Sequence, residues 1–194
     1  MTRTFVALLI PVEWKEYLGA CARSLAEGTS GLSWVKPENF HLTIRFLGDL
    51  GDSGVQRVSE WVAASADGLE APLGRLGPVG AFPNLDRPRA IWVGLAEGAE
   101  AFAEVARSVN DALKRKGFGP PDKPSRAHIT LARVRDGAKG LERIARAALP
   151  PPPAAAFLDR ICVMKSELHP AGSRYTALQE CQLRTPGGAP PPRP

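Results

Sequence analysis

The order of apolar and polar residues divides the chain into short strands and amphipathic helices. A mostly apolar run from Thr4 to Ile10 predicts a buried strand, and Pro11 begins a helix that Gly28 ends. Within this helix, apolar residues recur at steps of three and four: Val12, Trp14, Tyr17, Leu18, Cys21 and Leu25. The chain therefore opens with a strand followed by an amphipathic helix.

The remaining elements follow from the same patterns. We expect strands near residues 32–35, 40–48, 73–82, 90–95, 127–133, 161–168 and 175–183, separated by turns rich in glycine and proline. Apolar stripes predict a helix that Asp52 or Ser53 caps and that fades at Gly68, and further helices at 101–116 and 141–149. The clearest stripe consists of Phe102, Val105, Val109 and Leu113.

Two of the strands carry the same polar motif, His-x-Thr. The first reads His41-Leu42-Thr43-Ile44, and the second reads His128-Ile129-Thr130-Leu131. Because successive side chains of a strand point to opposite faces, each histidine shares a face with its threonine, and the aliphatic residues face the core. Two of the three histidines in the chain occupy this setting.

The order of secondary-structure elements around the two motifs also repeats. Strand, helix, loop and His-x-Thr strand occur twice, and 87 positions separate His41 from His128. This spacing indicates duplication of a lobe of fewer than about a hundred residues. Since two related lobes commonly pack about a pseudo-two-fold axis, we expect an α+β fold whose two polar faces oppose each other across a groove.

Length and composition favour one bilobal unit. A chain of 194 residues with 44% apolar residues can bury a substantial core, and we assign residues 1–184 to a single domain of two interleaved lobes. Proline and glycine make up seven of the ten residues 185–194, which we expect to be a disordered tail. Three widely spaced cysteines without a Cys-x-x-Cys pair favour a reduced cytoplasmic protein, and we expect a monomer. No apolar run is long enough to cross a bilayer or to form a secretory signal.

Positive charge is concentrated around the second His-x-Thr. Between Asp111 and Arg146, ten Lys and Arg residues stand against four Asp and Glu, a net of +6 in a chain whose total is +5. A solvated helix end and polar loop would account for this excess equally well. Its position beside His128 favours an anionic ligand such as phosphate.

Two opposed histidines suit acid–base chemistry at phosphorus. In-line opening of a cyclic phosphodiester by water needs a base on one side and an acid on the other, and an ordinary pKa near 6.5 lets histidine serve as either. The threonine hydroxyls would donate to the non-bridging oxygens. A lone histidine on a strand is usually structural, whereas two matched copies are more specific. No metal-ligand set accompanies His41 or His128, and we expect no metal or other cofactor.

Both His-x-Thr segments resemble the paired motifs of the two-histidine (2H) phosphoesterase superfamily, in particular its RNA 2′,3′-cyclic phosphodiesterase family, also called 2′-5′ RNA ligase. Further segments agree with that family: Trp34-Val35-Lys36-Pro37-Glu38-Asn39-Phe40, Phe46-Leu47-Gly48, Phe82-Pro83, Pro88-Arg89-Ala90-Ile91-Trp92-Val93-Gly94-Leu95 and Ser166-Glu167-Leu168. The resemblance covers nearly all of the chain except the tail.

The resemblance implies a bilobal fold with antiparallel sheets facing a central cleft and helices outside. It implies metal-independent hydrolysis of RNA 2′,3′-cyclic phosphate ends to 2′-phosphates, and it allows an ATP-independent reverse reaction that forms 2′-5′ linkages. The implied catalytic residues are His41, His128, Thr43 and Thr130. His41 would protonate the departing 3′ oxygen, and His128 would activate water.

Two arginines are candidates for binding the substrate. Arg133 matches the family's arginine after the second motif, yet simple alternation places it on the face opposite His128. Only a twist or a bulge would turn it toward the phosphate. Arg45 stands where the family usually has a small or apolar residue; being in phase with His41, it could reach the phosphate or cover the rim of the sheet.

Three further positions complete the substrate-binding set. Phe46 matches a family aromatic and could stack on a base or fill the core. Before the second motif the family tends to have an Arg-Pro-Phe run ending in Pro, whereas this chain reads Lys123-Pro124-Ser125-Arg126-Ala127, so the aromatic is missing and the cation Arg126 has appeared. Trp34 could line the mouth of the cleft. The other tryptophans, Trp14, Trp61 and Trp92, are predicted to lie in the core, and His169 in an exposed turn.

Two alternatives remain beside RNA cyclic-phosphate hydrolysis. The same chemistry could act on another cyclic nucleotide, a 2′-5′ oligonucleotide or a cyclic-phosphate ADP-ribose. A protein of another class, a non-catalytic RNA- or nucleotide-binding module, could use the same groove. Retention of both His-Thr pairs favours an enzyme, because arginine or lysine would suffice to bind phosphate.

Overall fold

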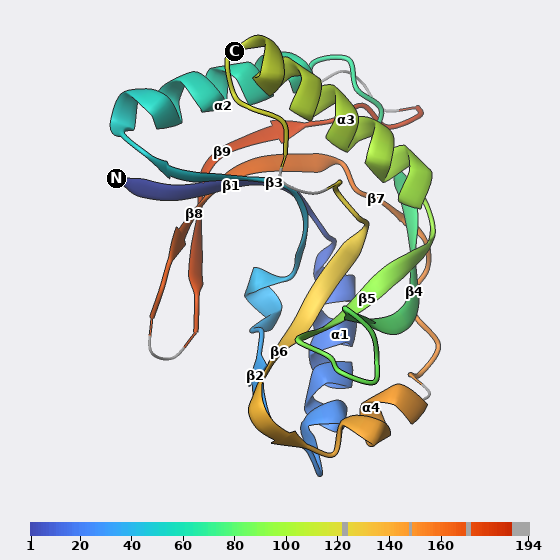
Figure 1. The fold of residues 1–194 in the computed structure, drawn as a ribbon. Helices are drawn as coiled ribbons and strands as arrows, with labels where there is room; N and C mark the ends of the chain where they lie inside the picture. The colour runs from blue at the N-terminus through green and yellow to red at the C-terminus, as the bar shows by residue number, and fades with distance from the viewer. Residues whose placement is uncertain (122–123, 148, 170–171, 188–194) are drawn as a thin grey trace.

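Two antiparallel sheets form the protein, which the computed structural model describes for residues 1–121, 124–147, 149–169 and 172–187 (Figure 1). The first sheet contains, in spatial order, β3 (His41–Leu50), β1 (Thr2–Leu9), β8 (Arg160–Glu167) and β9 (Arg174–Gln182). The second contains β2 (Ser30–Trp34), β6 (His128–Lys139), β5 (Ala90–Glu97), β4 (Leu73–Phe82) and β7 (Ala156–Phe157). The expected α+β class with antiparallel sheets is confirmed.

In the described residues, four helices lie outside the sheets: α1 (Val12–Ala26), α2 (Asp52–Ala66), α3 (Ala99–Arg115) and α4 (Leu141–Arg146). A short 3-10 turn, η1 (Pro37–Asn39), leads into β3. Helix α2 contacts all four strands of the first sheet, whereas α1 contacts β2 and β6 of the second. The predicted stripe of α3 is confirmed, because Phe102, Val105, Val109 and Leu113 are all buried.

The two sheets have matching cores. The order β3-β1-β8 in the first corresponds to β6-β5-β4 in the second, and in each a His-x-Thr strand lies beside the strand that opens its half of the chain. The halves also exchange elements, since β2 pairs with β6 and β8 pairs with β1. This arrangement brings the two His-x-Thr strands to facing edges of the groove.

The apolar faces of the sheets and helices form one continuous core. Its largest fully buried side chains include Trp14, Phe5, Phe40 and Phe102. The aliphatic residues between and after the motif positions, such as Leu42 and Ile129, are completely buried, as the alternation predicts. The core therefore holds the two His-x-Thr strands from behind.

Three local expectations were wrong. Helix α2 begins at Asp52 after Gly51, and neither Asp52 nor Ser53 caps it through its side chain. Helix α4 ends at Arg146 and not at Leu149. Val12 is 58% exposed, because it lies in the first turn of α1, away from the sheet.

After β9, the backbone of Arg184 forms an isolated β-bridge with Glu70. Most of the predicted tail, residues 188–194, lies outside the described residues. Cys21, Cys162 and Cys181 are free thiols. Within the described parts of the chain, no helix has the length and apolar character needed to cross a membrane.

Candidate active site

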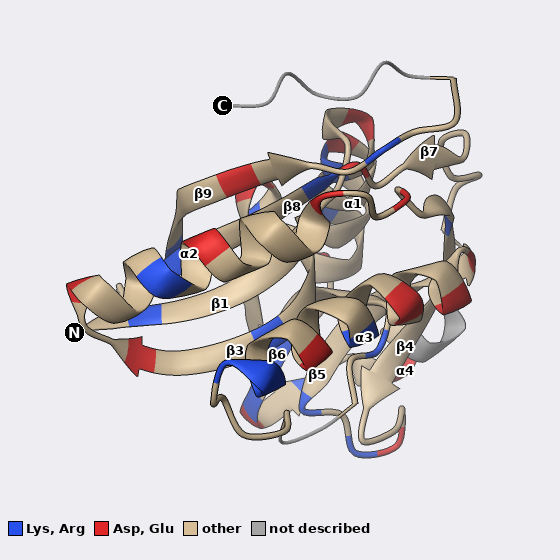
Figure 2. Cartoon of the chain, turned by 90° about the horizontal axis from the view of Figure 1, so that it is seen from above, with Lys and Arg blue, Asp and Glu red and all other residues tan. Residues whose placement is uncertain are grey.

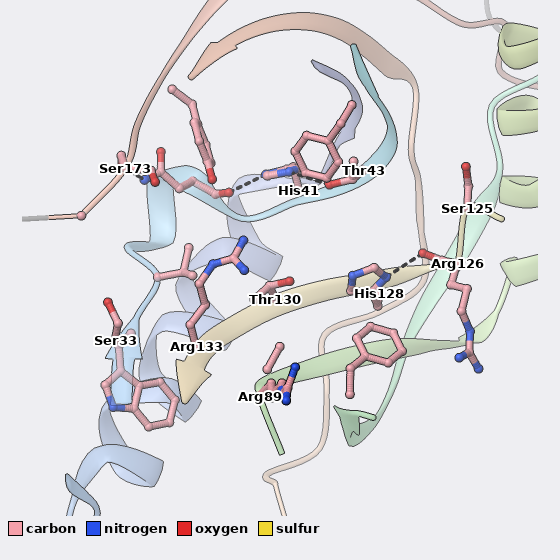
Figure 3. A pocket seen from close by; sticks show the side chains of 18 of the residues that line it. Ser33, His41, Thr43, Arg89, Ser125, Arg126, His128, Thr130, Arg133 and Ser173 are labelled. Carbon is pink, nitrogen blue, oxygen red and sulfur yellow. Dashed lines mark hydrogen bonds between the residues drawn. The ribbon is translucent and has the colours of Figure 1, made fainter. Parts of the chain in front are cut away.

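A groove of about 1390 Å³ lies between the two sheets and contains both His-Thr pairs (Figure 3). Strands β3 and β6 supply its two walls, and β2, the loop after β4 and the turn after β8 supply its ends. The volume exceeds the roughly 300–1,000 Å³ that is usual for small-molecule pockets. All nine predicted site residues line this groove: Trp34, His41, Thr43, Arg45, Phe46, Arg126, His128, Thr130 and Arg133.

The same irregularity follows both threonines. The strand register skips one residue after each of them, Ile44 in β3 and Leu131 in β6, which makes a β-bulge in each strand. The burial pattern of the six residues from each histidine is accordingly identical: half-buried, buried, half-buried, buried, buried, exposed. Each bulge shifts the alternation by one residue, so the third residue after each threonine returns to the groove face.

Arg133 and Phe46 are the residues that these bulges turn into the groove. Arg133 is exposed and projects from β6 toward the opposite wall in Figure 3. Phe46 is 62% exposed, which excludes the expectation that it fills the core. Its ring contacts Phe5, with centroids 5.7 Å apart, and leaves its other face to solvent.

Arg45 does not share the face of His41, contrary to the alternation argument. The bulge at Ile44 turns it away, and its side chain is only 7% exposed. Its guanidinium donates to Oδ1 of Asn110 on α3 at 3.3 Å and to the carbonyl of Gly119 in the following loop. Arg45 thus joins β3 to the segment that leads to the second motif, and its predicted contact with phosphate stays a prediction.

His41 is held from both sides. Its Nδ1 donates to the carbonyl of Asn39 at 2.7 Å, and its Nε2 lies 3.0 Å from Oγ1 of Thr43. Because a carbonyl only accepts hydrogen bonds, the neutral ring carries its proton on Nδ1, and the Thr43 hydroxyl donates to Nε2. The rings of Phe5 and Tyr175 pack against the imidazole, with centroids 5.0 and 5.4 Å away.

His128 has a matching environment in the other sheet. Its Nδ1 donates to the carbonyl of Arg126 at 2.8 Å, which leaves Nε2 for the groove. The rings of Phe82 and Trp92 pack against it, with centroids 4.9 and 6.2 Å away. Each histidine is therefore fixed by a backbone carbonyl two residues upstream and by two aromatic rings.

These surroundings lower the pKa of both histidines. The pKa of His41 is lowered to about 4, chiefly by burial; the hydrogen bond to the Asn39 carbonyl opposes this shift, and the nearby His128 and Lys15 add to it. Burial also lowers the pKa of His128, and the charge of Arg126 acts in the same direction. Both rings are consequently neutral in the free protein at pH 7.

The structure also gives the positions of Trp34, Trp92 and Arg126 relative to the groove. Trp34 is half-buried at the end of β2 and lines the groove, as expected. Trp92 does not lie in the core but on the groove side of its sheet, where its ring packs on His128. Gly80 is its partner on the neighbouring strand. A Cβ at Gly80 would lie 2.3 Å from the Trp92 ring, so only glycine leaves room for it. Arg126 lies over the Phe82 ring at 5.4 Å.

Sequence reasoning missed several residues that shape the site. The aromatic pairs beside the histidines come from four different strands, so no local pattern could group them. Ser125, which replaces part of the family's usual run, donates to the carbonyl of Ile44 at 2.5 Å and ties the two walls together. Arg87 and Arg89 line the groove from the loop after β4; their positive charge in a turn was a signal for both, and Arg89 also lies in a segment that agrees with the family.

The groove is strongly positive. Among the described residues that line it, seven are Lys or Arg and none is Asp or Glu. Acidic residues lie instead on the outer surfaces of α2 and α3, as Figure 2 shows. In residues 1–121, 124–147, 149–169 and 172–187, no three His, Cys, Asp or Glu side chains are grouped so that they could hold a metal ion.

Comparison with known proteins supports this duplicated site. The family described as LigT-like phosphoesterase matches the chain twice, over residues 8–92 and 93–175, with one His-x-Thr motif in each match. The chain belongs to the LigT-like phosphoesterase family. It is therefore an enzyme of the hydrolase class, and the duplication inferred from the two motifs agrees with the double match.

Individual members of the family resemble most of the chain. The RNA 2′,3′-cyclic phosphodiesterase of Archaeoglobus fulgidus is 35% identical over 133 residues, covering 69% of this chain and 73% of the relative. The protein of the same name from Thermotoga maritima is 28% identical over 181 residues, covering 93% and 95% of the two chains.

Solved structures share the fold. A protein of Thermus thermophilus superposes with a TM-score of 0.75 at 28% identity, covering 94% of this chain and 98% of its own. Escherichia coli LigT, crystallised with 3′-AMP, superposes with a TM-score of 0.69 at 22% identity and the same coverage. The α+β fold with two antiparallel sheets is thus shared with these solved structures.

Proposed function

We propose that this phosphoesterase hydrolyses the 2′,3′-cyclic phosphate end of RNA to a 2′-phosphate by a two-histidine mechanism without a metal ion. The observation that carries the proposal is the presence of two His-Thr pairs, with the same burial pattern and the same bulge, on facing walls of one positive groove. The names of the family members that cover most of this chain support RNA as the substrate.

The reaction uses both histidines in one in-line displacement. His128 accepts a proton from water at Nε2 while the water oxygen forms a bond to phosphorus. The bond from phosphorus to the 3′ oxygen breaks on the opposite side, and His41 gives its proton to that oxygen. A 5′-hydroxyl in place of water would form a 2′-5′ linkage by the same steps without ATP.

Binding of the substrate prepares this state. His41 is neutral in the free enzyme at pH 7, so it must take up its catalytic proton from solvent when the substrate binds. The anionic cyclic phosphate, placed beside the ring, raises the pKa of His41 because an opposite charge favours the protonated form. Protonation of Nε2 then releases the Thr43 hydroxyl, which can donate to a non-bridging oxygen as Thr130 does from the other wall.

Turnover in the presence of excess chelator tests the proposal. We expect the purified protein to open an oligonucleotide 2′,3′-cyclic phosphate at an undiminished rate, with the 2′-phosphate as product. Chromatography against 2′- and 3′-phosphate standards identifies the product. An inactive protein that still binds the RNA would favour the binding-module alternative, and loss of the rate in chelator would refute the metal-free mechanism.

The pH profile is expected to be bell-shaped and displaced toward acid for kcat/KM. Catalysis needs one protonated and one neutral histidine, and both free-enzyme pKa values lie below the ordinary 6.5. That form is most abundant between about pH 4, the pKa of His41, and the lowered pKa of His128, and it becomes about tenfold scarcer for each pH unit above the second value. Because bound phosphate raises the pKa, the alkaline limb of kcat should lie at higher pH than that of kcat/KM. A profile that is flat from pH 5 to 8, with chemistry rate-limiting, would contradict the mechanism.

A further inference from the structure

The cations of the groove are distributed unevenly about the histidines. At the end near Phe46, Arg126 reaches the groove, and Arg45 is bound to Asn110 and Gly119. Five cations gather at the other end, beyond Thr130 on β6, and we name them the basic arm: Lys36, Arg87, Arg89, Arg133 and Arg135.

The basic arm is built on fixed backbone. Arg133 lies in register between Ser33 of β2 and Ala90 of β5, at the centre of three paired strands. The carbonyl of Arg89 accepts from the Val134 N–H at 3.0 Å, and the Arg89 N–H donates to the Phe82 carbonyl at 2.7 Å.

The loop that carries Arg87 is fixed as well. The Arg87 N–H donates to Oδ1 of Asn84 at 3.0 Å, inside the loop between β4 and β5. Arg89, from the same loop, lies below Arg133 along the floor of the groove in Figure 3. Side chains from β6, this loop and the segment before η1 therefore extend from a common scaffold.

The charges of the arm are not neutralised by the protein. All five side chains are exposed, and none lies within 4 Å of a carboxylate among the described residues. Surface arginines elsewhere do have such partners, for example Arg75, whose Nε lies 2.9 Å from Glu97. The arm is thus a stripe of available positive charge that begins at the catalytic threonine.

The length of this stripe exceeds one nucleotide. Arg135 lies seven positions after His128, a distance of roughly 20 Å along a strand that rises about 3.3 Å per residue. Stacked nucleotides advance by about 3.4 Å each along the helix axis, so the stripe spans several phosphates. A cyclic mononucleotide held between His41 and His128 could not reach Arg135.

We propose that the basic arm binds the phosphates upstream of the cyclic end, so that the substrate is an RNA strand several nucleotides long. The strand leaves the histidines along β6 toward Trp34, and the Phe46 end of the groove receives no upstream phosphate. This inference rests on the proposed function and adds to it the polymer class of the substrate and the direction in which the strand leaves the site.

Substrate length tests this inference. The substrates are a 2′,3′-cyclic mononucleotide and oligonucleotides of two, four and eight residues with the same end, assayed with the parent and with the double variant Arg87→Gln/Arg135→Gln. We expect kcat/KM of the parent to rise at least tenfold from one to four nucleotides, and the double variant to lose most of that ratio. Arg107→Gln, which removes an exposed charge from the outer helix α3, is the matched control and should keep the ratio.

Binding of a product-like RNA gives a readout that does not depend on turnover. Fluorescence anisotropy with an octanucleotide 2′-phosphate over a range of salt should show a slope of log K against log salt that is shallower by about 0.7 for each arginine removed. If the parent binds the octamer with this salt dependence but hydrolyses no substrate, the role of the basic arm in RNA binding is supported and the proposed function is refuted. If the parent hydrolyses all lengths equally, or the double variant loses as much on the mononucleotide as on the octamer, the basic arm is refuted.

Discussion

Replacing His41 or His128 by alanine is expected to lower kcat for an oligonucleotide 2′,3′-cyclic phosphate by about 10²–10⁴-fold, the usual contribution of a general acid or base. Each ring is oriented by a carbonyl hydrogen bond and two aromatic neighbours, and no other titratable side chain is fixed in this way on the two walls among the described residues. Initial rates measured by chromatography in excess chelator check this result.

The remaining histidine supplies the control. His169 lines the groove from the turn after β8, is exposed and has no threonine two residues later. His169→Ala should therefore cost less than about tenfold, because exposed side chains outside the reacting geometry contribute little to general acid–base catalysis. Thermal unfolding should show that all three variants are folded. A motif variant that keeps more than a tenth of the parent rate would contradict the two-histidine mechanism.

A substrate with a better leaving group should distinguish the general acid from the general base. A phosphodiester that releases p-nitrophenolate needs little protonation by an acid, whereas attack by water still needs a base. We expect His41→Ala to recover most of its activity relative to the parent on such a substrate, and His128→Ala to remain impaired. The opposite pattern would exchange the assigned roles of acid and base.

Replacing Thr43 and Thr130 by valine is the second substitution with a large expected effect. Valine keeps the shape of threonine and its preference for strands but removes the hydroxyl that stabilises charge on the non-bridging oxygens. Each variant is expected to lower kcat by about 10²–10³-fold, comparable to the loss of one oxyanion donor.

The two threonine variants should also differ from each other. Thr43 bonds Nε2 of His41 in the free enzyme, so its loss should also shift the alkaline limb of the kcat profile, which the general acid sets, whereas the loss of Thr130 should not. Thr176→Val, on the exposed strand β9, is the matched control and should leave the rate unchanged. Equal rates for the parent and both motif variants would remove the threonines from the mechanism.

Much of the fold could be predicted because local patterns carried it. The strand at 73–82 and the apolar stripe of α3 agree with the structure, since burial on one face imposes its period on the sequence. Boundaries set by caps were less predictable: the glycine before α2 competes with two good capping residues, and only the backbone decides between them.

The two His-Thr pairs could be found from the sequence because a strand fixes the relation between positions two apart. The same rule failed at Arg45 and at Arg133, because in each strand a single inserted residue reverses the alternation beyond it. The placement of Trp92 failed for a different reason. Its sheet is apolar on both faces near His128, so hydrophobicity could not tell the core from the wall of the groove.

The sequence by itself determined the chemistry: two histidines, two threonines and the repeat that makes them a pair. The tertiary structure decided the environment of that chemistry, because the rings that lower the histidine pKa values and the cations of the basic arm come from separate elements. Such neighbours are set by strand pairing between distant segments and by bulges within a strand. Neither leaves a periodic signal along the chain, so only the folded sheets bring these residues together.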